Sequence, residues 1–150
     1  MENSPVQHSI DVALVVIANL VNVALTGIFL ARPFKLDQVE YFLGLFLSGL
    51  VLPIIGLVAL NWRSHREWWT IFLPLMLAGF LLLDFILDYI LGINWRITWM
   101  KGPILLFYYA SVMVMIGYAF LTGKVYGVVT LITYFLCLGA TLYSLSRVGY

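Results

Sequence analysis

Two aspartates, Asp84 and Asp88, lie four residues apart in LLLDFILDYILGINW, a stretch that is otherwise almost entirely apolar. A carboxylate near the centre of a membrane-spanning helix costs about 2.5 to 3.5 kcal/mol, so such a group usually faces the interior of a helix bundle and has a partner there. Residues at (i, i+4) share one face of a helix. We therefore expect both carboxyl groups on the inner face of one helix, where a carboxyl group can bind a cation or a proton or hydrogen-bond a neighbouring helix.

The two aspartates differ in depth, and this difference predicts different roles. In the apolar stretch that contains them, Asp84 lies about 5 Å past the midpoint and Asp88 about 11 Å, at a rise of roughly 1.5 Å per residue. Asp88 is then close enough to the membrane surface for the long side chains of Arg32, Arg96 or Arg147 to reach it. We expect an ion pair for Asp88. For Asp84 we expect either a role in binding a ligand, ion or proton, or a hydrogen bond that joins helices.

The composition is that of an integral membrane protein. Hydrophobic residues make up 63% of the 150 positions and charged residues only 10%, against roughly 25% charged in soluble domains. Eight Lys and Arg nearly balance seven Asp and Glu, and no run of like charges forms a basic patch, so we expect no nucleic-acid partner. The single cysteine, Cys137, excludes an internal disulfide and every CxxC redox or zinc motif.

Five apolar stretches are each long enough to cross a hydrocarbon core of roughly 30 Å, which takes about 20 helical residues. Uninterrupted apolar runs of this length are typical of spanning helices and not of the alternating strands of a barrel. Pro53 and Pro74 remove backbone hydrogen bonds and predict kinks in the second and third helices. The sequence predicts one all-α domain over residues 1–150, a bundle of five transmembrane helices at about 10–31, 40–61, 70–91, 103–122 and 125–146.

The basic residues of the connections and termini predict an orientation. Three lie on the side of the N-terminus, namely Arg63, Arg66 and Lys124. Five lie on the side of the C-terminus, namely Arg32, Lys35, Arg96, Lys101 and Arg147. Because basic residues concentrate on the cytoplasmic side, the excess favours an N-terminus outside and a C-terminus inside a plasma or inner membrane.

Polar side chains repeat at helical spacing on the other helices, as on faces turned toward protein rather than lipid. The clearest stripe lies on the last helix, where Tyr126, Thr130 and Thr133 are followed by Cys137, Thr141 and Ser144. Matching depths along antiparallel helices predicts one polar layer at the level of Asp84. With Asp84 and Asp88, this layer forms the predicted ligand-binding set, whose other members are Asn22, Thr26, Ser48, Tyr108, Ser111, Cys137 and Thr141.

Several kinds of cofactor chemistry lack their residues in the predicted spans. A transmembrane haem needs histidine ligands, but His8 and His65 both lie outside the spans. A retinal Schiff base needs a buried lysine, and every lysine lies at a helix end. No nucleophile elbow, phosphate loop or HExxH motif occurs either. We therefore expect no cofactor and no resident metal, and an enzyme is the less favoured class.

One enzymatic interpretation comes from a short resemblance. Asp84-Phe85-Ile86-Leu87-Asp88 is a D-x-x-x-D element, which resembles part of the Mg²⁺ and diphosphate sites of intramembrane prenyltransferases and CDP-alcohol phosphotransferases. The resemblance covers five of the 150 residues and implies a Mg²⁺-dependent enzyme acting on lipid diphosphates, with both aspartates at the metal. The preceding turn, 80–83, supplies none of the further aspartates those families use.

The favoured hypothesis is a small membrane protein that binds a small cationic or amphipathic molecule or a proton at an intramembrane site around Asp84. An extended version of this hypothesis adds transport of the bound molecule or proton across the membrane. The competing hypothesis is a structural or accessory subunit, in which the same polar layer joins helices or protomers. A chain this small often needs several protomers to enclose a pathway. A homo-oligomer or a larger membrane complex is therefore an expected partner arrangement, beside the lipid bilayer itself.

Overall fold

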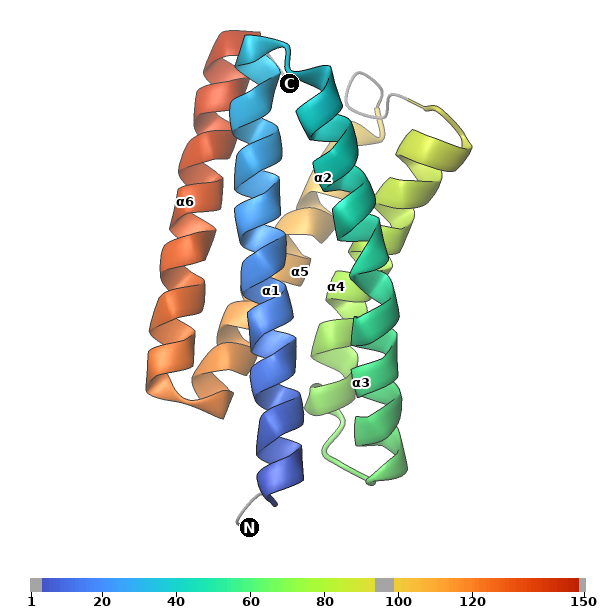
Figure 1. Cartoon of the computed structure of the whole chain (residues 1–150), viewed down its shortest axis with the longest axis vertical. Helices are drawn as coiled ribbons and strands as arrows, with labels where there is room; N and C mark the ends of the chain where they lie inside the picture. Colours follow the sequence, from blue (N-terminus) through green and yellow to red (C-terminus); the bar gives the residue numbers. More distant parts are fainter. Residues whose placement is uncertain (1–3, 94–98, 149–150) are drawn as a thin grey trace.

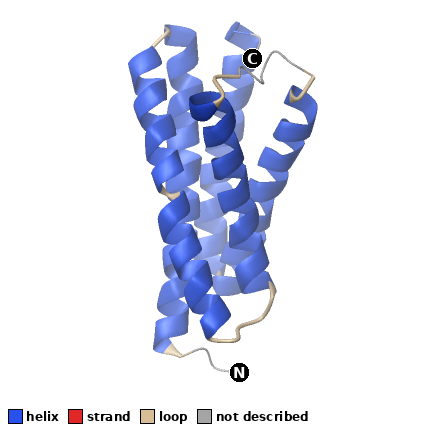
Figure 2. Ribbon diagram, turned by 90° about the vertical axis from the view of Figure 1, so that its right-hand side faces the viewer, coloured by secondary structure: helices blue, strands red, loops and turns tan. Residues whose placement is uncertain are grey.

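Within residues 4–93 and 99–148, which this computed structural model describes, all regular elements are helices (Figures 1 and 2). They are α1 (Pro5–Ala31), η1 (Arg32–Phe34), α2 (Asp37–Gly49), α3 (Val51–Arg63), α4 (Trp69–Phe85), η2 (Ile86–Ile90), α5 (Lys101–Thr122) and α6 (Lys124–Val148). The first helix begins at a well-formed cap. The Ser4 hydroxyl accepts a hydrogen bond from the backbone N–H of Gln7, and the Gln7 side chain accepts one from the backbone N–H of Ser4.

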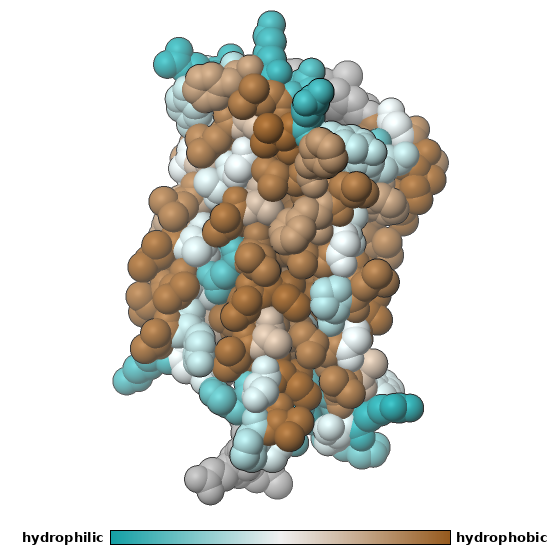
Figure 3. Space-filling view, in the orientation of Figure 1, coloured by the Kyte–Doolittle hydropathy of each residue, from teal (hydrophilic) through white to brown (hydrophobic). Residues whose placement is uncertain are grey.

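These elements combine into helices that are long and apolar enough to cross a membrane. In the described ranges there are five, namely Pro5–Phe34, Asp37–Arg63, Trp69–Ile90, Lys101–Thr122 and Lys124–Val148. Hydrophobic residues cover the middle of the face shown in Figure 3, and hydrophilic residues gather at its two ends. The prediction of an all-helical chain with five long apolar helices is confirmed.

The helices run up and down, so that the two ends of the chain lie at opposite ends of the bundle (Figure 1). We call these the N-terminal end, which contains the connection between α3 and α4, and the C-terminal end, which contains η1 and the start of α5. Helix α1 is the centre of the packing and contacts α6, α5, α2 and α3. Its buried side chains run from Ile10 to Ala31, along almost the whole helix.

Two prolines affect the second and third spans differently. Helix α2 ends at Gly49 and α3 begins at Val51, because the ring of Pro53 cannot donate to the carbonyl of Gly49 and crowds it. Helix α4, in contrast, continues through Pro74. The Thr70 carbonyl, which Pro74 cannot reach with an N–H, accepts a hydrogen bond of 3.1 Å from Nδ2 of the fully buried Asn61.

Asn61 belongs to a buried polar network at the N-terminal end of the bundle. The Arg66 guanidinium donates to both carboxylate oxygens of Asp11, at 2.7 and 2.9 Å, and its Nη1 also lies 3.2 Å from Oδ1 of Asn61. The Tyr118 hydroxyl donates to the same carboxylate at 2.6 Å. Side chains from α1, α3, α5 and the α3–α4 connection are thereby joined around Asp11, which is only 3% exposed.

The electrostatics of this network favour the charged form of Arg66. Hydrogen bonding to Asp11 raises the pKa of Arg66 above its ordinary value, and the attraction of the same carboxylate adds to this while burial opposes it. A raised arginine pKa stabilises the fold at every pH below it, so alkaline conditions in the usable range leave the ion pair intact. The two parallel hydrogen bonds between Arg66 and Asp11 also fix the relative orientation of the guanidinium and the carboxylate.

A second polar seam joins α1 to α6. Thr133 donates to Oδ1 of Asn19 at 2.7 Å and accepts from Nδ2 of Asn22 at 3.0 Å, while Asn19 donates to Thr130 at 3.0 Å. The predicted stripe on the last helix therefore faces α1 over this segment. Interhelical hydrogen bonds of this kind average about 0.6 kcal/mol in membranes, so their main effect is to fix which faces meet.

We predict that Asp11→Asn destabilises the chain, because it leaves the buried Arg66 without its counter-ion. Loss of one partner of a buried pair costs on the order of 3 kcal/mol. The free energy of unfolding in mixed micelles of a mild detergent and dodecyl sulfate measures this, with Asp37→Asn, at an exposed carboxylate, as the matched control. Arg66→Lys keeps the positive charge but loses the bidentate guanidinium. Its free energy of unfolding should therefore lie between those of Asp11→Asn and the control. Equal unfolding curves for Asp11→Asn and the control would contradict the prediction.

Candidate functional site

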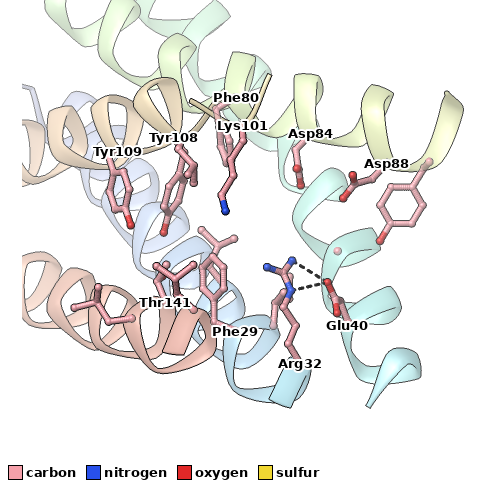
Figure 4. A pocket seen from close by; sticks show the side chains of 17 residues that line it. Phe29, Arg32, Glu40, Phe80, Asp84, Asp88, Lys101, Tyr108, Tyr109 and Thr141 are labelled. Carbon is pink, nitrogen blue, oxygen red and sulfur yellow. Dashed lines mark hydrogen bonds and ion pairs between the residues drawn. The ribbon is translucent and has the colours of Figure 1, made fainter. Parts of the chain in front are cut away.

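A cavity of about 190 Å³ lies inside the C-terminal half of the bundle. Every one of the five long helices contributes to its wall (Figure 4). Its charged lining residues are Arg32, Glu40, Asp84, Asp88 and Lys101. The remaining lining residues are aromatic, aliphatic or small, namely Leu25, Ile28, Phe29, Gly44, Phe80, Tyr89, Leu105, Tyr108, Tyr109, Thr141, Leu142 and Leu145.

An ion pair between the first and second spans forms one side of the cavity. Arg32, in η1, donates from Nε to Oε1 of Glu40 at 2.9 Å, and its Nη2 lies 2.8 Å from the same oxygen. The chain can turn back between them because Lys35 adopts a left-handed backbone conformation, with φ of 54°. The Arg32 guanidinium also lies 5.0 Å from the ring centre of Phe29, within reach of a cation–π interaction.

Asp84 and Asp88 face this ion pair from the opposite side, and both point into the cavity (Figure 4). Asp84 is near the end of α4, whereas Asp88 is in the π-helix η2. The N–H of Leu91 bonds to the carbonyl of Ile86 at 2.9 Å, five residues back, and Gly92 ends the helix in a left-handed conformation. Single π turns are rare and often occur at functional sites. Here the turn widens the helix where it carries Asp88.

Lys101 brings a second positive charge into the cavity. It is the first residue of α5, and its ammonium group extends into the space between the aspartates and Tyr108 (Figure 4). The start of a helix carries a partial positive charge, so both the side chain and the helix end raise the potential at this side of the cavity. The lining therefore presents carboxylates and cations within one cavity.

The deeper part of the cavity has an aromatic wall. The ring centres of Phe80 and Tyr108 lie 5.2 Å apart, and the ring centres of Tyr108 and Tyr109 lie 4.8 Å apart. The Tyr108 hydroxyl is 3.0 Å from Sγ of Cys137, which is buried behind it in α6. A polar end lined by charges thus continues into an apolar interior. That arrangement suits a molecule with a charged group and a hydrophobic body.

Tyr89 closes the cavity on the side of α2. Its hydroxyl donates to the Tyr41 carbonyl at 3.0 Å. Its ring stacks on that of Phe85, with the ring centres 5.4 Å apart. A methyl group at Gly44 would overlap the Tyr89 hydroxyl, so this close approach needs glycine. A shallower hollow adjoins the cavity here and shares three lining residues with it, Glu40, Asp88 and Tyr89.

The structure brings four of the nine residues of the predicted set to the cavity, namely Asp84, Asp88, Tyr108 and Thr141. Cys137 lies behind Tyr108. The other four are not part of the lining and make hydrogen bonds within or between helices. Thr26 donates to the Asn22 carbonyl at 2.7 Å, Ser48 to the Gly44 carbonyl at 2.9 Å, Ser111 to the Phe107 carbonyl at 2.7 Å, and Asn22 to Thr133 at 3.0 Å.

Of the three basic residues expected near Asp88, two make other contacts. Arg32 forms its ion pair with Glu40, and the Arg147 guanidinium lies 5.7 Å from the ring centre of Tyr143. Arg96, the third expected partner, lies outside the described residues. Sequence reasoning assigned Lys101 and Glu40 to the ends of helices and did not place them in the site. Their only signal was that both lie at the same end of the bundle as Asp88.

Metal ligation can be examined directly for the described ranges. In these ranges, no three His, Cys, Asp or Glu side chains come together in a group that could hold a metal ion. Asp84 and Asp88 share the cavity with Lys101, so a diphosphate-bound Mg²⁺ between them would have a cation as its neighbour. Comparison of the chain with protein-family models, with curated proteins and with solved structures finds no match.

We predict that Gly44→Ala lowers stability because the new methyl group displaces the Tyr89 ring from α2. Overpacking of a well-packed core costs about 1 to 3 kcal/mol, and we expect the low end of that range here because the Tyr89 hydroxyl is the far end of a partly exposed side chain. Gly56→Ala is the matched control, since nothing lies within 4 Å of a methyl group there and alanine favours the helix.

Tyr89→Phe removes the obstructing hydroxyl, so adding Gly44→Ala to Tyr89→Phe should cost much less than adding it to the parent chain. The unfolding free energies of the four proteins in this cycle give the coupling. Equal costs in both backgrounds would show that Tyr89 does not pack on Gly44.

Proposed function

We propose that this chain is an integral membrane protein that binds a small amphipathic molecule with a cationic group, in the cavity around Asp84. In the proposed orientation the N-terminus is outside and the C-terminus inside, in a plasma or inner membrane. The cavity then lies in the inner half of the bilayer. Its charged end lies close to the inner headgroups.

Membrane insertion is supported by the length and surface of the helices. Five apolar helices cross the bundle in alternating directions, and large hydrophobic side chains such as Leu52, Leu106 and Phe135 are exposed on the outside. In water such a surface would be unfavourable, whereas hydrocarbon is a good solvent for it. The polar networks described above satisfy buried polar side chains such as Asp11, Asn22 and Asn61 from within, as a lipid environment requires.

The single observation that carries the binding proposal is the cavity in which Asp84 and Asp88 face an aromatic wall. Carboxylates attract an ammonium group, and the faces of Phe80, Tyr108 and Tyr109 can hold a cation or an apolar chain. Low-dielectric walls on several sides make these attractions stronger than they would be at an open surface.

The two ends of the bundle favour binding as the basic activity. The cavity adjoins a hollow at the C-terminal end, whereas the buried Asp11–Arg66–Tyr118 network fills the N-terminal end. Release of a ligand to the other side would require that network to separate. Transport is therefore an additional step, and proton coupling through Asp84 is one way to drive it.

The accessory-subunit hypothesis uses the same polar layer to join protomers. Asn22 of that layer bonds to Thr133, which bonds in turn to Asn19, so these contacts join α1 to α6 within one chain. This observation favours a layer that organises the single bundle over one that joins protomers. A Mg²⁺-dependent enzyme remains the third hypothesis, on the D-x-x-x-D spacing alone.

The orientation predicts opposite labelling of the two termini. Ser4→Cys and Tyr150→Cys, each in a Cys137→Ser background, should react with a membrane-impermeant thiol reagent from opposite sides of sealed vesicles, with Ser4→Cys labelled from outside. Labelling of both from one side would contradict an odd number of crossings. Labelling of Ser4→Cys only from inside would reverse the orientation and leave the five crossings unchanged.

Ligand binding predicts a specific loss in Asp84→Asn. Dodecyltrimethylammonium, a single-chain cation, should bind the purified chain in maltoside micelles, and Asp84→Asn should weaken this binding at least tenfold because the amide carries no charge. Asp84→Glu should retain most of it. Glu67→Gln, at an exposed carboxylate of the opposite end, is the matched control. Equilibrium binding of the radiolabelled cation gives the affinities, and equal binding by Asp84→Asn and the control would remove Asp84 from the site.

A further inference from the structure

The cavity contains two cations that a purely cationic ligand would not need. Lys101 extends between the aspartates and Tyr108, and Arg32 lies across from them, held by Glu40 at 2.8 Å (Figure 4). A positive ligand entering this space is attracted by the carboxylates and repelled by Lys101. Lys101 can act as an internal counter-ion of the aspartates, and its position also allows it to bind an anionic group of the ligand.

We infer that the ligand is a zwitterionic amphiphile, whose cationic group lies at Asp84 and Asp88 and whose anionic group lies at Lys101. This inference rests on the proposed function and deepens it by naming the second charged group of the ligand. The chemistry required of that group is a phosphate or a carboxylate, each of which a lysine ammonium binds as a point charge.

The position of Lys101 on its helix supports an anion there. Lys101 is the first residue of α5, so the partial positive charge of a 22-residue helix adds to the ammonium group at this place. Arg32 is already engaged by Glu40 and by the face of Phe29, which keeps it at the edge of the site. Lys101 is thus the cation with the reach and the direction to meet a ligand.

The size and lining of the cavity restrict the rest of the ligand. Drug-sized ligands occupy roughly 300 to 1,000 Å³, and this cavity is smaller, about 190 Å³. It can hold a charged head and part of one chain along Leu105, Phe80 and Tyr108, with the remainder of the chain between helices. A single-chain zwitterion fits this description better than an intact two-chain lipid.

Three probes separate the contributions of the two charges and the chain. Dodecylphosphocholine and dodecyltrimethylammonium share the chain and the cation, and only the first carries a phosphate. Glycerophosphocholine carries the zwitterionic head without a long chain, and so stands for a water-soluble source of the same chemistry. Each is measured at equilibrium against the intact chain in maltoside micelles, below its own micelle concentration.

The inference predicts that dodecylphosphocholine binds at least tenfold more tightly than dodecyltrimethylammonium. Lys101→Met should abolish this advantage while dodecyltrimethylammonium binds equally well or better, because a repulsion is removed. Lys101→Arg should restore much of the advantage. Lys124→Met, at the other end of the bundle, is the control, and unfolding curves of all variants verify that each is folded. Tighter binding of dodecylphosphocholine than of glycerophosphocholine identifies a lipid-like source, and the reverse identifies a soluble zwitterion.

The outcomes distinguish this inference from the function on which it rests. If both dodecyl probes bind with equal affinity and Lys101→Met changes neither, the anionic site does not exist and Lys101 serves as an internal counter-ion, while binding at Asp84 stands. If dodecylphosphocholine keeps its advantage in Lys101→Met, the phosphate lies elsewhere and the assignment to Lys101 is wrong. If no probe binds the parent chain, the proposed function itself fails.

Discussion

A buried charged or amide group in a bundle with an apolar exterior needs its partner inside the bundle, and this constraint shapes how the helices are arranged. The effect is clearest at Pro74. Its missing N–H leaves the Thr70 carbonyl without a helical donor, Asn61 supplies one at 3.1 Å, and the other end of the Asn61 amide accepts from Arg66. Through Arg66 and Asp11 the consequence of one proline reaches α1 and α5.

The same constraint is met differently at the two ends of the bundle. At the N-terminal end the charged groups pair directly, and the space between the helices is filled by side chains such as Tyr118, which is completely buried. At the C-terminal end, charges of both signs line a cavity. A cavity of this kind contributes less packing than a filled core. A bound molecule with matching charges would offset that loss, which links the arrangement of the fold to the function proposed for it.

Much of this architecture follows from residue types and spacing. The apolar runs predict the five long helices because burial in lipid demands uninterrupted helical segments. The polar stripe on the last helix predicts a face turned toward protein, and the structure places Thr130 and Thr133 of that stripe against α1. Asp84 and Asp88 were predicted to face the interior. Their spacing alone contains no sign of the π turn that carries Asp88.

Partners distant in sequence could not be predicted in the same way. Asp11 and Arg66 are 55 positions apart, and periodicity identifies a polar face without identifying the residue it meets. Depth matching placed Ser48 and Ser111 at the level of Asp84, but short polar side chains bond to their own helix when a carbonyl is within reach. Lys101 was assigned to a helix end, where flexible lysines usually extend to water. Only the packing of α5 turns its side chain inward.

The central claim is that the cavity around Asp84 holds an amphipathic molecule. Mass spectrometry of the intact protein, released gently from membranes in a mild detergent, tests it most directly. The account predicts a small-molecule adduct on the parent chain that is lost in Asp84→Asn and retained in the Glu67→Gln control. A parent chain that carries no small molecule, or that retains the same adduct in Asp84→Asn, would contradict it. If a stoichiometric protein partner is recovered in place of a small molecule, the accessory-subunit hypothesis is favoured.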